Sequence, residues 1–116
     1  MSEQLLKALV KKLLTTPKEN IIITEYCKKS GGEAGINVDE ALSKFLSFNP
    51  RWSFSTHEGE KGRRVESYYR LSPRRAWLGV FEFGGPIFLV NVMPINTRKQ
   101  KLIDKLYIRS EDAHVV

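Results

Sequence analysis

The sequence has a single cysteine, Cys27, so no disulfide can form within the chain. It also lacks any apolar run close to the ~18 residues that a membrane-spanning helix needs. Its first residues, Ser2-Glu3-Gln4, do not carry the positive charge that begins a signal peptide. These absences predict a protein inside the cell, in the cytoplasm or nucleus, with Cys27 as a small buried apolar side chain.

Motifs that carry catalysis or hold a cofactor are also missing. The chain contains neither the Gly-x-x-x-x-Gly-Lys loop of nucleotide-binding proteins nor the Gly-x-Ser-x-Gly turn of serine hydrolases. Its two histidines, His57 and His114, form no spaced pair with a cysteine or carboxylate that would bind a metal. We therefore expect no enzymatic activity, no cofactor and no metal.

Positive charge, in contrast, is abundant and unevenly distributed. The 116 residues include 19 lysines and arginines against 13 aspartates and glutamates, which gives a net charge of +6 and a pI near 9.6. Residues 51–75 hold seven basic and three acidic side chains and so account for +4 of this excess. A concentrated positive charge predicts a polyanionic partner, such as nucleic acid, an anionic membrane or an acidic protein.

The length predicts a single domain over residues 1–116, and the first half reads as helices. Residues 3–14 carry apolar side chains on one face and lysines on the other. A second helix is predicted from about Thr24 to the stop at Ser30-Gly31-Gly32. The isoleucines at 21–23 suit either a short strand or an earlier start of this helix.

A third helix is predicted between Asn37, which is placed to cap it, and Asn49-Pro50, which ends it. After it, residues 52–57 and 65–71 alternate between apolar and polar side chains, which is typical of a hairpin. This alternation turns Trp52 and Tyr69 toward the core.

A second hairpin is predicted over residues 76–94, with Gly84-Gly85-Pro86 as its turn. Its strands are apolar on both faces, so we expect the helices to cover one face and a partner subunit the other. A last helix is predicted over 97–107, and the tail from Ser110 is expected to fray. The fold is thus expected to be α+β, with three N-terminal helices, antiparallel β-hairpins and a C-terminal helix.

Three helices followed by a basic hairpin that ends Tyr68-Tyr69-Arg70-Leu71-Ser72-Pro73 resemble a winged helix-turn-helix domain over residues 3–72. The resemblance implies a DNA-binding regulator of transcription. Its third helix would enter the major groove, and its hairpin, the wing, would contact phosphates or the minor groove. Residues 76–109 would form an extension outside this core and a possible dimerisation unit.

Candidate contacts follow from this arrangement. Arginine offers a planar fork of donors that matches phosphate oxygens, and we expect Lys61, Arg63 and Arg64 at the wing tip to bind phosphates or enter a groove. Further contacts with nucleic acid, of which duplex DNA is favoured, are expected from the hairpin base, the second and third helices and one stacking ring: Arg51, Arg70, Arg74, Arg75, Lys28, Lys29, Ser43, Lys44, Ser47 and Tyr68.

A second function remains open at this point. The third helix has no arginine and begins with Asp39 and Glu40, which face phosphates unfavourably. The chain could instead be a protein-interaction module, an adaptor or inhibitor, that uses the apolar hairpin 76–93 and the helix 98–108 as its interface. The wing charge would then steer an acidic protein partner. The same apolar surfaces predict a homodimer, which would pair two DNA half-sites.

Overall fold

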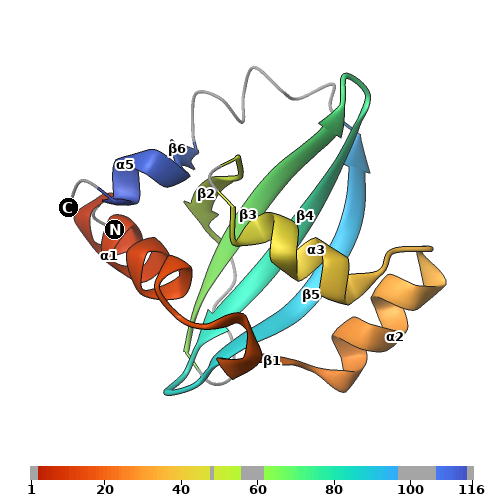
Figure 1. Ribbon diagram of the computed structural model, residues 1–116, viewed down its shortest axis with the longest axis horizontal. Coiled ribbons are helices and arrows are strands. Elements are labelled where there is room, and N and C mark those ends of the chain that lie inside the picture. Colours follow the sequence, from red (N-terminus) through yellow and green to blue (C-terminus); the bar gives the residue numbers. More distant parts are fainter. Residues whose placement is uncertain (1–2, 48, 56–61, 97–106, 115–116) are drawn as a thin grey trace.

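The computed structural model describes residues 3–47, 49–55, 62–96 and 107–114, and Figure 1 shows helices packed against one sheet. The sheet has the order β1-β5-β4-β3-β2-β6, in which β1 runs parallel to β5 and the other pairs are antiparallel. The strands are β1 (Ile21–Ile23), β2 (Arg51–Phe54), β3 (Arg63–Ser72), β4 (Arg75–Phe83), β5 (Ile87–Asn96) and β6 (Ile108–Arg109). The helices are α1 (Glu3–Leu14), the 3-10 turn η1 (Lys18–Asn20), α2 (Glu25–Glu33), α3 (Val38–Phe45) and α5 (Ser110–His114). The expected α+β fold, with N-terminal helices, antiparallel hairpins and a C-terminal helix, is confirmed.

The N-terminal helices begin where local sequence signals place them. The hydroxyl oxygen of Thr24 accepts the amide of Cys27 at 3.1 Å and caps α2. The side-chain oxygen of Asn37 accepts the amide of Glu40 at 3.0 Å and caps α3, as predicted. Such acceptors satisfy amides that have no partner in the first turn of a helix.

The end of α2 differs from the prediction, because the helix continues through Gly31 to Glu33. Gly31 lies against Val38 at the start of α3, and a Cβ at this position would come within 2.3 Å of Val38 Cγ2. The glycine lets two helices approach closely, so packing overrides its low helix propensity. The isoleucines before α2 form a strand, because they pair in register with Ile87–Leu89 of β5.

The core lies between the sheet and α3, which crosses one face of it (Figure 1). The ring of Phe45 lies on Gly79, where a Cβ would be 2.5 Å from Phe45 Cε2. The same ring meets Phe81 edge-on, with centroids 6.0 Å apart, and Trp52 lies 5.9 Å from Phe81. Trp52 is fully buried and Tyr69 packs against this core, which confirms the direction predicted for both rings.

The C-terminal segment packs into the protein, so the expectation of a frayed tail from Ser110 is wrong. Ser110 Oγ accepts a hydrogen bond from Trp52 Nε1 at 2.7 Å and donates one to the carbonyl of Pro50 at 2.9 Å. Ala113 is fully buried, and α5 packs against α1. The helix predicted over 97–107 lies outside the described residues except for its last position. No helix in the described ranges is long and apolar enough to cross a bilayer.

Candidate functional site

The positive charge of residues 51–75 is divided between the two ends of one long strand. β3 contains ten residues. At ~3.3 Å per residue, its first residues, Arg63 and Arg64, lie roughly 25–30 Å from the turn that joins β3 to β4. The basic segment therefore has two separate cationic ends.

The β3–β4 turn presents arginines that are exposed. Arg70, Arg74 and Arg75 are all exposed, and the ion pairs between described residues include none of them. Arg70 braces the turn, because its Nε donates to the carbonyl of Ser72 at 3.2 Å and its Nη2 to that of Pro73 at 3.4 Å. In Figure 1 this end of the hairpin, at the upper right, extends beyond the helices.

The opposite end of β3 differs because its arginines contact the protein. Arg64 lies across from Glu82 of β4, with Nε 3.2 Å from Oε1, and Glu82 is only 4% exposed. The guanidinium of Arg63 lies 6.0 Å from the centre of the Phe54 ring. Lys61, the remaining residue of the expected wing tip, lies outside the described residues. The charge of Arg64 is thus compensated by a buried carboxylate, whereas the sequence predicts a phosphate contact for it.

The side chains predicted to face the major groove from α3 also contact the protein. Ser43 Oγ accepts a hydrogen bond from Lys18 Nζ at 2.6 Å. Lys44 Nζ lies 5.5 Å from the centre of the Tyr69 ring, and Ser47 Oγ donates to the carbonyl of Lys44 at 2.6 Å. The contacts of Ser43 and Lys44 hold α3 to η1 and to β3, whereas the hydrogen bond of Ser47 is local to the end of the helix.

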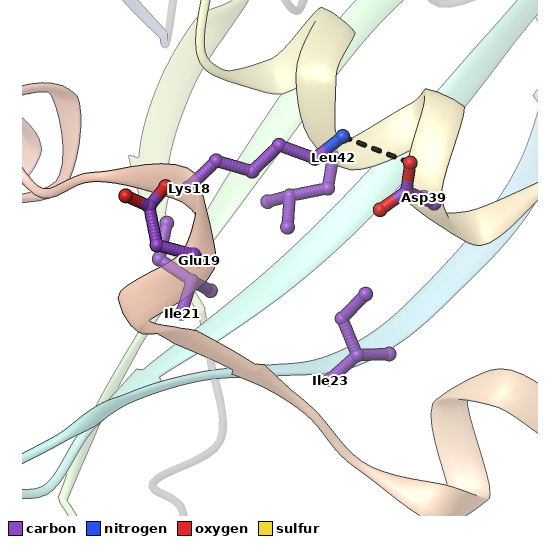
Figure 2. Close-up of a pocket in the computed structure, with 6 residues that line it drawn as sticks. All are labelled: Lys18, Glu19, Ile21, Ile23, Asp39 and Leu42. Atoms are coloured by element: carbon purple, nitrogen blue, oxygen red, sulfur yellow. Dashed lines mark hydrogen bonds and ion pairs between the residues drawn. The ribbon is translucent and has the colours of Figure 1, made fainter.

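A small pocket lies beside α3, between it, η1 and β1 (Figure 2). It has a volume of about 320 Å³, and Lys18 extends from η1 to place its Nζ 2.9 Å from Asp39 Oδ2. The carboxylates of Asp39 and Glu40 at the start of α3 are 75% and 59% exposed. Both carboxylates have a lysine partner, because Lys44 Nζ also lies 4.0 Å from Glu40 Oε1, so the charges at this end of α3 are largely compensated.

The three other basic candidates, Lys28, Arg51 and Lys29, differ in exposure and in their partners. Lys28 forms an ion pair with Glu25 at 3.2 Å, within one turn of α2. Arg51 is half-buried in β2 and pairs in register with Arg109 of β6. Lys29 is exposed on α2, and no ion pair between described residues includes it. Of these three residues, Lys29 is the one best placed to meet a polyanion.

Tyr68 is not on the surface, so the prediction that its ring stacks on a base is wrong. The alternation of β3 correctly turns it away from the main core, but only 2% of the residue is exposed. It forms a second, smaller apolar cluster with Ala76, Ile95 and Tyr107. Burial in this cluster leaves no ring face for a base.

The sheet face away from α3 carries a groove that the sequence does not reveal. It has a volume of about 600 Å³, and its lining includes Tyr26, Arg64, Glu66, Val80, Val90 and Asn91. The hydroxyl of Tyr107 donates to Glu66 Oε2 at 2.8 Å, and burial together with this carboxylate raises the pKa of Tyr107. The sequence analysis missed this groove, and the signal that could have indicated it is the polar Asn91 within the otherwise apolar strand β5.

Comparisons with protein families, with curated proteins and with solved structures found no match for this chain. The winged-helix resemblance therefore rests on the order of the elements and on the basic hairpin. The β2–β3 hairpin that this resemblance names as the wing is, in the structure, part of a larger sheet, because β3 also pairs with β4.

Proposed function

We propose that the protein is a non-enzymatic nucleic-acid-binding protein that contacts the phosphate backbone through the β3–β4 turn. The observation that supports this most directly is the exposure of Arg70, Arg74 and Arg75 without a carboxylate partner among the described residues. Guanidinium groups match phosphate oxygens in shape and charge and form charge-assisted hydrogen bonds with them. The proposal keeps the DNA-binding role implied by the winged-helix resemblance and moves the main contacts to the other end of β3.

The turn is suited to this role because its backbone is restrained before any ligand binds. Pro73 fixes one backbone dihedral, and the two hydrogen bonds from Arg70 close the turn over the carbonyls of Ser72 and Pro73. A restrained backbone loses little conformational freedom on binding. Contact with phosphates does not require α3 to enter the major groove, where its exposed Asp39 would face the backbone.

The test is fluorescence anisotropy with labelled duplex DNA, single-stranded DNA and RNA at several salt concentrations. The variant is Arg74→Ala/Arg75→Ala, and the matched control is Lys11→Ala/Lys12→Ala, which removes the same charge from the exposed side of α1. We expect the wild type to bind more weakly as salt rises. If the variant loses two phosphate contacts, the slope of log K against log salt should fall in magnitude by about 1.4–1.8.

Two outcomes would overturn the proposal. The first is the absence of binding to every probe at low salt, which would leave the protein-interaction module as the function to pursue. The second is an equal loss of affinity in the α1 control, which would mean that net charge rather than the turn attracts the nucleic acid. Circular dichroism of both variants must show the wild-type fold.

A further inference from the structure

A leucine is exposed at the end of the β3–β4 hairpin, among the arginines of the turn. Leu71 is 40% exposed, and the residues that follow it closely, Pro73, Arg74 and Arg75, are exposed as well. In Figure 1 this end of the hairpin extends beyond the helices. A single exposed leucine is ordinary on a protein surface, so its meaning depends on the side chains that surround it.

A bulge in β3 determines which residue lies opposite Leu71. The register of β3 with β4 shifts between Arg70, which pairs with Ala76, and Ser72, which pairs with Arg75. Leu71 is the extra residue of this bulge, so Leu71 and Ser72 together lie opposite Arg75. The exposed leucine is therefore placed directly against an exposed arginine of the partner strand.

Leu71 and Arg75 also share one face of the hairpin. Side chains two residues apart in a strand lie on the same face, so Leu71 follows Tyr69 and Arg75 lies with Trp77. Both of these rings pack against the main core, on the side of the sheet that α3 crosses. Arg70 lies on the opposite face and donates two hydrogen bonds to carbonyls of the turn. The tip thus carries one apolar side chain with a cation beside it.

An apolar side chain beside arginines matches one particular way of binding DNA. Proteins that bind the minor groove contact it with arginine or lysine, and they frequently insert an apolar wedge, such as leucine or proline, between base steps. The wedge partly unstacks two base pairs and kinks the duplex toward its major groove. A leucine offers no hydrogen bond to a base edge, whereas insertion between bases removes its apolar surface from water.

We propose that the β3–β4 turn enters the minor groove of duplex DNA and that Leu71 inserts between two base pairs and bends the duplex. This inference rests on the proposed function and names its substrate, duplex DNA, and the groove that the turn occupies. Arg74 and Arg75 contact the phosphates beside the wedge. The hydrogen bonds from Arg70 restrain the turn, so little conformational freedom is lost on insertion.

The first experiment measures bending, by energy transfer between dyes at the two ends of a short duplex. We expect the full chain to bend the duplex by about 20–90°. Leu71→Ser should abolish the bend, and Leu71→Met, which keeps an apolar side chain of similar volume, should retain it. The matched control Ile22→Ser removes an apolar side chain of β1 that is 46% exposed, and it should leave the bend unchanged.

Anisotropy titrations test the wedge and the groove separately. A mismatched base pair is easier to unstack, so the wild type should bind a duplex with one mismatch about tenfold more tightly than the matched duplex. Leu71→Ser should bind the two duplexes alike. Replacing guanine with inosine removes an amine from the minor groove only, which opens that groove and should strengthen binding. Replacing guanine with 7-deazaguanine alters the major groove only and should change nothing.

The wedge proposal fails if the wild type binds without bending the duplex, if Leu71→Ser bends it like the wild type, or if 7-deazaguanine rather than inosine changes the affinity. The proposed function survives each of these results as long as Arg74→Ala/Arg75→Ala still weakens binding, because phosphate contacts need no wedge. If no nucleic acid binds at low salt, both proposals fall together. Binding to phosphatidylserine vesicles that depends on Leu71 would then identify the tip as a membrane contact.

Discussion

The pair between Arg64 and Glu82 should be essential to the fold. Arg64→Met removes the guanidinium while keeping most of the apolar stem. It leaves the Glu82 carboxylate, whose side chain is 5% exposed, without its cation at 3.2 Å. Breaking a buried ion pair from one side costs about 3–5 kcal/mol. Because a third of the Arg64 side chain meets water, we expect the low end, about 3 kcal/mol.

A loss of that size is a large share of the ~5–15 kcal/mol that stabilises a typical domain, and for this length it lowers the melting temperature by about 10–15 °C. The assay is urea unfolding followed by the fluorescence of the two tryptophans, of which Trp52 is fully buried in the native protein. Arg64→Met/Glu82→Gln should recover most of the stability, because no uncompensated charge remains in the interior. Together with the single variants Arg64→Met and Glu82→Gln, the double variant forms a thermodynamic cycle that measures the coupling free energy between the two side chains.

The reasoning is refuted if Arg64→Met lies within about 0.5 kcal/mol of the wild type, as a solvent-screened surface pair would. In that case Arg64 returns to the candidates for phosphate binding. If Arg64→Met destabilises the protein as expected, a loss of nucleic-acid binding in that variant would reflect unfolding and not the loss of a phosphate contact. Arg74 and Arg75 avoid this problem because they are exposed at the turn.

Two further predictions concern the interior. Ser110→Ala should destabilise the protein by about 1–3 kcal/mol, because it leaves the buried indole N–H of Trp52 without an acceptor; an unchanged melting temperature would mean that the tail is frayed after all. Burial raises the pKa of Cys27 from 9.0 to about 11, so the unfolded chain releases this proton first and stability should fall as pH rises from 9 to 11. This fall of stability with pH should be shallower in Cys27→Ala. An equal fall of the melting temperature between pH 9 and 11 in the two proteins would contradict the prediction.

Local chemistry explains the parts of the fold that the sequence predicts well. The cap of α3 depends on Asn37 and Glu40, three residues apart, and the helical face of α1 depends on side chains within a few turns. Contacts between distant residues explain the errors. α2 passes through Gly31 because Val38 fills the space beside it, and Ser110 is ordered by Trp52, 58 residues earlier.

The same distinction between local patterns and contacts of distant residues applies to the candidate site. Alternation along β3 correctly separates Tyr68 from Tyr69, but it cannot show that a second cluster covers Tyr68. It also cannot show that Arg64 faces Glu82, because that pairing depends on the register of β3 with β4. The exposed arginines of the β3–β4 turn are among the predicted contacts. Their distance from the wing tip could not be predicted, because it depends on the length of β3 in the structure. The predicted homodimer stays a prediction.

The described residues separate opposite charges between the β3–β4 turn, which carries exposed arginines, and the groove that Glu66 lines. Glu66 and Arg64 line the groove. Because Glu82 compensates the charge of Arg64, Glu66 gives the groove a negative charge that disfavours phosphate. Exposed cations such as Arg74, Arg75 and Lys29 do not line the groove. We therefore expect the phosphates of a bound polyanion to contact the β3–β4 turn and not the groove.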